Sequence, residues 1–425
     1  MAVECSRIFA RTEFVRTSHD IDYSAKLKMA SRYHKALIRA IVLLIVIQFL
    51  LSGLFLHGLS AYSAEQTVTV GVHPAGVVYD SGKDEIFVTN SGENTVSVIS
   101  DTTNKVVAAV VVGANPFGLG YDSNKGEIFV ANYGSGTVSV ISDSNNTVVA
   151  TVKVESFPFG VAFDSGKGEV FVADSGNDTV SVISDINDGV TKTISVGSYP
   201  SGVAYDPDKG EIFVTNHLSG TVSVISDISD DVIANISVGN FPLDLSYDST
   251  KGDMYVANAG SFTVSVISCS SNDVVANVSV GVYPVGVAYD SGMGEIFVVD
   301  DGYSSTAYNN TVSVISDANN TVIKTVFVGV DPAGAAYDSS KGEVFVANSY
   351  VADKGNSTVS IILDSSLAST FIVTSTSSSL AVGASSSNNQ SSRILYFGVA
   401  VVMGVVGTVV ILQKRRSRQD SSSIT

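Results

Sequence analysis

Few residues of this chain are arranged for catalysis or for metal binding. Between residues 66 and 363 the only histidines are His73 and His217, and no local motif completes a Ser-His-Asp set around them. No His/Cys cluster has the spacing of a zinc site. Residues 206–211 faintly resemble a calcium loop, but their counterparts, such as residues 122–127, fit ordinary hairpin turns. We therefore predict no catalytic residue, no metal and no cofactor.

Aromatic side chains are better candidates for a binding surface. They gather in two sets of loops that vary between the copies of an internal repeat. Exposed Tyr and Phe rings are effective anchors for sugar and protein partners. The candidate ligand-binding residues are His73, Phe117, Tyr133, Phe159, Tyr199, His217, Phe262, Tyr283, Tyr303, Tyr308 and Tyr350.

The loops belong to a repeat of about forty residues that occurs seven times. Its clearest marker is a proline, mostly in the setting Val-Gly-x-x-Pro. The prolines are Pro74, Pro116, Pro158, Pro200, Pro242, Pro284 and Pro332, with spacings of 42 residues and a last gap of 48. A period of this size with several strands per unit is typical of a β-propeller.

The second copy shows what each repeat is expected to form. Residues 117–122, 127–132, 137–142 and 147–154 are rich in β-branched and aromatic residues and are separated by turn residues. The second and third of these strands are apolar on both faces, which predicts blades packed between two neighbours. We therefore predict an all-β, seven-bladed β-propeller of four-stranded antiparallel blades over residues 66–363.

The two ends of the repeat array predict how the ring closes. Residues 67–72 have the sequence of a fourth strand with no blade before it, and residues 358–363 that of a third strand with no fourth strand after it. The N-terminal strand should complete the seventh blade and leave no free sheet edge; an open solenoid is the alternative. In such blades the loops before the prolines and the loops between second and third strands emerge on one face.

The second strands also carry a family resemblance. They end in Phe-Val-Thr-Asn at residues 87–90, Phe-Val-Ala-Asn at residues 129–132 and Tyr-Val-Ala-Asn at residues 255–258, and Thr-Val-Ser follows each. These repeats resemble the YVTN family of β-propeller repeats, common in archaeal surface-layer and other cell-surface proteins. The resemblance implies the fold and a place at the cell surface. It implies no activity, because propellers host many unrelated functions.

The flanking segments predict a membrane-anchored protein. Residues 1–64 form a basic leader with an apolar stretch at 40–59, either a cleaved signal peptide, for which the true start could be Met29, or an uncleaved anchor. Residues 364–392 are a Ser/Thr-rich stalk. The uncharged residues 394–412 are long enough to span a bilayer as a transmembrane helix.

The basic tail at residues 413–425 should stay on the cytoplasmic side, which places the propeller outside the cell. Small residues at Ala400, Gly404 and Thr408 form a stripe that would allow dimerisation of the membrane helix. The predicted location is thus the cell membrane, with a single-pass anchor and an extracellular propeller.

The charge of the repeat region limits its partners, and its single cysteine has a structural interpretation. Residues 66–363 contain 34 Asp and Glu against 11 Lys and no Arg, a net charge near −23. Nucleic acid is excluded as a partner, because phosphate binding requires a basic surface. Cys269 stands where other repeats carry Asp, so we expect a substituted turn residue; a functional thiol is the alternative.

Eight Asn-x-Ser/Thr sequons predict a glycoprotein. They lie at Asn145, Asn177, Asn235, Asn277, Asn309, Asn319, Asn356 and Asn389.

The leading functional hypothesis is a non-catalytic recognition, adhesion or surface-layer module. Its expected partners are the membrane, through the anchor, and cell-surface glycans or envelope proteins. YVTN-like propellers also resemble seven-bladed lactonases and streptogramin lyases, which makes such an enzyme one alternative. A purely architectural coat protein is the other.

Overall fold

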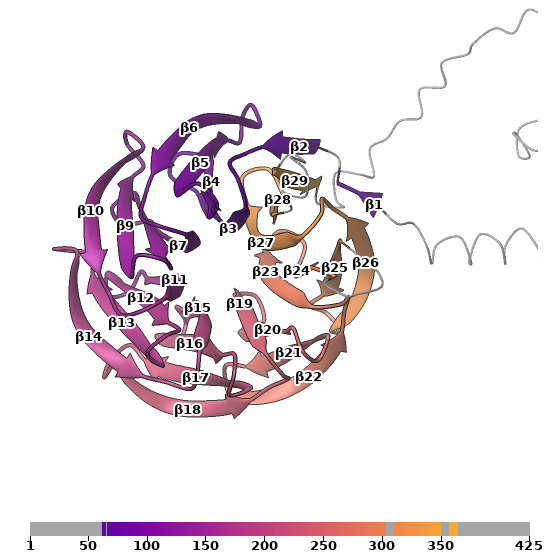
Figure 1. The fold of residues 1–425 in the computed structure, drawn as a ribbon. Helices are drawn as coiled ribbons and strands as arrows, with labels where there is room; N and C mark the ends of the chain where they lie inside the picture. Colours follow the sequence, from indigo (N-terminus) through magenta and orange to yellow (C-terminus); the bar gives the residue numbers. More distant parts are fainter. Residues whose placement is uncertain (1–61, 65, 303–309, 350–356, 364–425) are drawn as a thin grey trace, which may run out of the picture. The chain divides into compact units, whose positions relative to one another are not determined.

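The computed structural model describes residues 62–64, 66–302, 310–349 and 357–363. These residues form a seven-bladed β-propeller, a ring of four-stranded antiparallel blades around a central channel (Figure 1). The described part of the chain contains strands and turns and no helix. The predicted all-β propeller is confirmed.

The first six blades use their four strands in chain order from the channel outward, and the seventh takes its outer strand from the N-terminal end of the ring. The innermost strands are β3 (Pro74–Asp80), β7 (Pro116–Asp122), β11 (Pro158–Asp164), β15 (Pro200–Asp206), β19 (Pro242–Asp248), β23 (Pro284–Asp290) and β27 (Pro332–Asp338). The second strands are β4 (Glu85–Asn90), β8 (Glu127–Asn132), β12 (Glu169–Asp174), β16 (Glu211–Asn216), β20 (Asp253–Asn258), β24 (Glu295–Asp300) and β28 (Glu343–Asn348). The third strands are β5 (Thr95–Ser100), β9 (Thr137–Ser142), β13 (Thr179–Ser184), β17 (Thr221–Ser226), β21 (Thr263–Ser268), β25 (Thr311–Ser316) and β29 (Thr358–Leu363). The outer strands are β6 (Lys105–Val111), β10 (Thr147–Lys153), β14 (Gly189–Ser195), β18 (Asp231–Ser237), β22 (Asp273–Ser279), β26 (Thr321–Phe327) and, for the seventh blade, β2 (Gln66–Thr69).

The hydrophobic core is divided into seven clusters, one between each pair of adjacent blades. Between blades 2 and 3, for example, Phe129 and Val138 pack with Val170 and Ile183, and all four are fully buried. Because each second and third strand contributes to the cluster on either side of its blade, both of its faces must be apolar. This is the physical reason for the unbroken Ile-Phe-Val and Val-Ile runs.

The ring is closed by the N-terminal strand, as predicted. Strand β2 pairs antiparallel with β29, in a register that runs from Gln66 opposite Ile361 to Thr69 opposite Thr358. Val68 is buried beside Phe345 in the cluster between blades 7 and 1. The strand is shorter than the predicted residues 67–72.

A second N-terminal contact was not predicted. The two-residue strand β1 (Tyr62–Ser63) pairs parallel with β26, the outer strand of blade 6. The Ala64 N–H donates a hydrogen bond of 2.9 Å to the Phe327 carbonyl. The described N-terminal segment therefore contacts two consecutive blades.

The turns between strands 1 and 2 and between strands 3 and 4 form what we call the lower face of the ring. The Asp that ends each innermost strand is buried there. In blade 2, Asp122 Oδ1 accepts hydrogen bonds from the Asn124 and Lys125 N–H groups at 2.8 and 3.2 Å. The repeated aromatic-Asp motif is thus a turn-forming element, since an aspartate that accepts backbone N–H groups two and three residues on stabilises a tight turn.

Cys269 lies in one of these lower turns, and its thiol is buried in the cluster between blades 4 and 5. Burial raises the pKa of the thiol well above its ordinary value, so it stays protonated.

The second strands end in an Asn or Asp whose side chain bonds to residues of the third strand. In blade 2, Asn132 Nδ2 donates to Thr137 Oγ1 and Ser139 Oγ at 3.1 and 3.0 Å. In blade 3 the hydrogen bond is reversed, because Ser181 Oγ donates to Asp174 Oδ2 at 2.7 Å. These side chains therefore join strand 2 to strand 3 within each of these blades.

Most of the predicted leader and the stalk, membrane helix and basic tail, at residues 1–61, 364–392, 394–412 and 413–425, lie outside the described residues. Within the described ranges, no helix is long and apolar enough to cross a membrane.

Candidate functional site at the mouth of the channel

The opposite, upper face carries the variable loops. Loops that precede the prolines hydrogen-bond to loops between strands 2 and 3: the Ser91 N–H donates to the His73 carbonyl and the Tyr133 N–H to the Asn115 carbonyl, at 2.9 and 3.0 Å. The same bond recurs in the other blades. The two loop sets therefore meet on one face, as the blade topology predicted.

Seven aromatic side chains form a continuous arc on this face, which we call the aromatic crescent. Its members are Phe117, Tyr133, Phe157, Phe159, Tyr199, His217 and Phe241, from blades 2 to 5. Phe117 stacks on Phe159 and Tyr133 on Phe157, with ring centroids 5.0 and 4.8 Å apart. The Tyr133 and Tyr199 hydroxyls lie 3.2 Å apart and join the two halves of the arc. Phe157 and Phe241 each remain 46% exposed, so the crescent has free ring surface.

The residue before each repeat proline has a left-handed backbone. The φ angles lie between 52° and 59° at His73, Asn115, Phe157, Tyr199, Phe241, Tyr283 and Asp331. Asn and Asp tolerate this conformation, whereas bulky side chains are disfavoured there by roughly 1 kcal/mol. Phe or Tyr, present at four of these positions, is therefore not the residue that the backbone alone favours. Such outliers suggest function when the side chain is also exposed.

His217 supplies a polar group within the crescent. Its ring stacks on Phe241, with centroids 5.0 Å apart, and hydrogen-bonds the Pro242 carbonyl. Burial lowers the pKa of His217, so the imidazole is neutral near pH 7. Its Nδ1 atom is buried and has no hydrogen-bond partner among the described residues.

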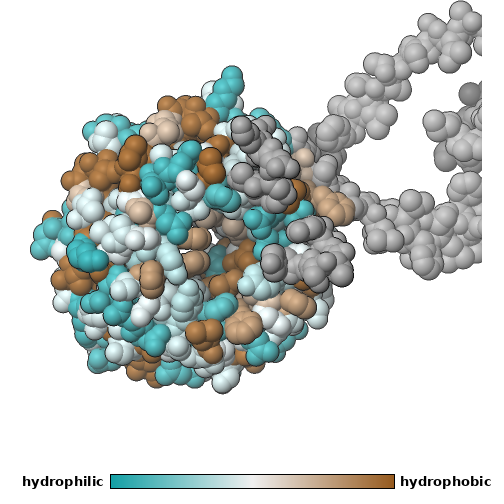
Figure 2. Space-filling view, viewed as in Figure 1, coloured by the Kyte–Doolittle hydropathy of each residue, from teal (hydrophilic) through white to brown (hydrophobic). Residues whose placement is uncertain are grey.

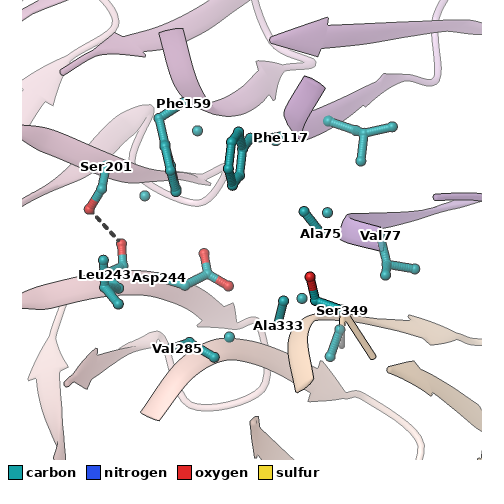
Figure 3. A pocket seen from close by; sticks show the side chains of 18 of the residues that line it. Ala75, Val77, Phe117, Phe159, Ser201, Leu243, Asp244, Val285, Ala333 and Ser349 are labelled. Atoms are coloured by element: carbon teal, nitrogen blue, oxygen red, sulfur yellow. Dashed lines mark hydrogen bonds between the residues drawn. The ribbon is translucent and has the colours of Figure 1, made fainter. Parts of the chain in front are cut away.

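Inside the crescent the upper face opens into a cavity of about 330 Å³. Figure 2 shows the hollow at the centre of the ring. Innermost strands of all seven blades line it. Phe117 and Phe159 lie on one side, and the Asp244 carboxylate points into the cavity from the opposite side (Figure 3).

Glycine allows the innermost strands to pack closely around the channel. A Cβ atom on Gly118 or Gly160 would lie 2.2 or 2.1 Å from a backbone oxygen of the next blade. Six blades have glycine at this position, the third residue of the strand, and blade 5 has Asp244. In the adjoining blade 6 the strand register also departs from the others, because Gly286 pairs with Val299.

Three carboxyl groups line the cavity, from Asp244, Asp301 and Asp331 in blades 5, 6 and 7. Burial raises the pKa of Asp244 to about 6. The pKa of Asp301 is raised to about 7 by burial and then by its hydrogen bond to the Asp331 carboxyl. The described residues that line the cavity include no Lys, Arg or His. The mouth thus has an aromatic side and an acidic side.

The sequence-predicted residues divide into three groups. Phe117, Tyr133, Phe159, Tyr199 and His217 come together in the crescent. His73, Phe262 and Tyr283 lie in upper-face loops beyond the crescent. Tyr303, Tyr308 and Tyr350 lie outside the described residues.

Sequence reasoning did not select Phe157, Phe241, Asp244, Asp301 or Asp331. Phe157 and Phe241 share only their place before a repeat proline and belong to no recognisable sequence motif. Asp244 carried a usable signal, because it replaces a residue that is glycine in the six other copies.

The sequons that the structure describes are accessible. Asn145, Asn177, Asn235, Asn277 and Asn319 are all exposed. Asn309, Asn356 and Asn389 lie outside the described residues. Among the described residues no group of three or more His, Cys, Asp or Glu side chains is placed to hold a metal ion.

Comparison with known proteins supports the fold. No family model matches the chain, and no curated protein matches its sequence. Among solved structures, the chain is similar to hydrazine synthase of Kuenenia stuttgartiensis, with a TM-score of 0.60 and 17% sequence identity. The match covers 72% of this chain and 99% of that chain. At this identity the likeness shows a shared β-propeller fold and nothing about activity.

Proposed function

We propose that this protein is a non-catalytic recognition module that binds glycans through the aromatic crescent. The observation that carries the proposal is the set of aromatic residues held at positive φ, partly exposed, on adjacent blades. Asn115 occupies the same position in blade 2, so the backbone does not require an aromatic residue there.

The chemistry of the crescent suits a sugar. Flat aromatic rings offer rigid apolar surface against the C–H faces of a pyranose, at low entropic cost. The Tyr133 and Tyr199 hydroxyls supply hydrogen-bonding groups of the kind that sugar hydroxyls require. The acidic propeller favours neutral over anionic glycans.

The cellular setting of the proposal rests on the sequence. The repeats resemble the YVTN family, and residues 1–64 and 394–412 have the composition of a leader and a single membrane anchor. We place the propeller on the outer side of the cell membrane, on a glycosylated stalk, with the basic tail in the cytoplasm. A surface-layer or adhesion role fits this setting.

A panel of neutral cell-surface glycans, tested by array and then by calorimetry, measures the proposed activity. Phe157→Asn, Tyr199→Asn and Phe241→Asn each install the residue of blade 2. We expect each to weaken binding at least tenfold, because each removes a stacking ring. Ile228→Ser, at an 86% exposed residue of the lower face, is the matched control and should bind normally.

Two results contradict the proposal. One is binding that survives all three Asn substitutions together, or that is confined to envelope proteins. The other is turnover of a lactone panel by the unmodified protein, which would favour the enzyme hypothesis.

A further inference from the structure

We propose that the central cavity binds a small organic cation, namely a protonated amine that carries an apolar group. This site adjoins the glycan surface, because Phe117 and Phe159 belong to both, but its acidic side lies outside the crescent. The juxtaposition that carries the proposal is a carboxylate at a position that packing reserves for glycine, facing a wall of two stacked phenylalanines.

Asp244 occupies a position where a side chain is sterically expensive. In the other six blades a Cβ atom at this position would approach a backbone oxygen of the next blade to between 2.1 and 2.5 Å. In blade 5 the chain accommodates a whole carboxyl group. Its Oδ2 accepts a hydrogen bond of 3.0 Å from the Val287 N–H of blade 6, which fixes the side chain across the blade boundary. The hydrogen bond holds the carboxyl group at the wall of the cavity, where it presents a fixed negative charge to a ligand.

Acidic groups dominate the polar lining of the cavity. Asp301 and Asp331 line it together with Asp244, and none of the described residues that line it is basic. Removing carboxylates from water is costly unless a positive charge or hydrogen-bond donors replace the lost solvation. The raised pKa values of Asp244 and Asp301 reflect this lost solvation of the ionised carboxyl groups. A bound cation would compensate for the lost solvation.

The opposite wall indicates what the rest of the ligand must be. Phe117 and Phe159 stack 5.0 Å apart, and Leu119 and Val161 continue the apolar surface. Aromatic faces attract ammonium groups and pack against alkyl or aryl groups. The cavity volume of about 330 Å³ lies at the lower end of small-molecule sites, which fits a compact ligand.

A metal ion fits the site less well. Calcium requires six to eight oxygen ligands around one point. In the described part of the chain, the carboxyls do not converge as any group of three that could hold a metal. Carboxyls from three different blades that line the cavity without converging on one point suit a small organic cation instead.

Benzylammonium and its neutral analogue benzyl alcohol test the proposal directly. They are titrated into the full-length chain by isothermal calorimetry at pH 8. We expect benzylammonium to bind one site per chain, at least tenfold more tightly than benzyl alcohol. Equal affinities, or no binding of benzylammonium, overturn the proposal, and so does calcium that displaces benzylammonium stoichiometrically.

Variants taken from the other blades locate the site. Asp244→Gly, Asp301→Ser and Asp331→Asn each install a residue found at the same repeat position elsewhere in the chain. We expect Asp244→Gly and Asp301→Ser to reduce benzylammonium affinity at least tenfold, with Ile228→Ser unchanged. Unchanged affinity in Asp244→Gly, at an unaltered melting temperature or a raised one, refutes the assignment. Glycan binding by the same variant reports on the crescent, so the two proposals can fail separately.

Discussion

The lower and upper faces of the ring use the same repeat in opposite ways. On the lower face six innermost strands end in a buried aspartate whose Oδ1 accepts two backbone N–H groups, and the geometry hardly varies. On the upper face the backbone is equally regular, since all seven pre-proline residues share one conformation, yet the side chains differ. Regular backbone with constant side chains marks the scaffold. Regular backbone with changing side chains marks the surface that is free to bind.

We expect the largest effect from a substitution in the buried aspartate turns of the lower face. Asp122→Ala removes the acceptor of two backbone N–H groups in a buried turn, and we expect a loss of about 3 kcal/mol in unfolding free energy. Asp122→Asn keeps the acceptor oxygen and removes a charge whose burial raises the pKa of Asp122, so it should cost less than about 1 kcal/mol. Urea unfolding followed by circular dichroism measures both. Equal losses in the two variants would show that the turn hydrogen bonds are not what the repeat conserves.

The second prediction concerns Asp244, where the upper side of the ring departs from the repeat. The pKa of Asp244 is raised from 3.8 to about 6 in the folded protein, so its charge destabilises the fold above pH 6 and has no effect below about pH 4. Asp244→Gly should therefore raise the unfolding free energy by an amount on the order of 2 kcal/mol at pH 7. The gain should shrink as the pH falls from 6 to 4.

Unfolding free energies of both proteins between pH 4 and pH 8 provide the measurement. Other carboxyls with raised pKa values are common to both proteins and cancel in the difference. A difference that is independent of pH would show that Asp244 acts through sterics rather than through its charge.

We expect the smallest effect from two substitutions that exchange the pre-proline side chains of blades 2 and 3. Phe157→Asn should stabilise the fold by up to about 1 kcal/mol, because Asn tolerates the left-handed backbone. Asn115→Phe should destabilise by a similar amount for the same reason. Opposite shifts in the urea midpoints would sharpen the contrast between the faces. Destabilisation by Phe157→Asn would mean that the crescent is part of the scaffold.

The fold could be predicted from the sequence because the signal is repeated. Each copy carries the same prolines, turn residues and apolar runs, and the mismatched ends at residues 67–72 and 358–363 indicate closure. The pairing of β1 with β26 could not be predicted, because a two-residue parallel strand has no distinctive pattern. Its residues also lie within the predicted leader.

The candidate site could be predicted only in part. Blade topology assigns the variable loops to one face, which gives the region and five members of the crescent. The acidic side depends on which residues face the channel across blade boundaries, such as Asp301 and Asp331, and sequence distance does not reveal that proximity. Asp244 can be identified by aligning the seven repeats, because the six other copies have glycine at its position.

Ring closure through β2 and β29 also determines how the propeller responds to pulling. The two strands are antiparallel, and Gln66 lies opposite Ile361, so the chain enters and leaves the ring at neighbouring points. A tensile load between these two points acts on the four residue pairs of this one ladder, while the six other blades bear little of it. We expect β2 to separate from β29 at a low force, so that the ring opens before any complete blade unfolds.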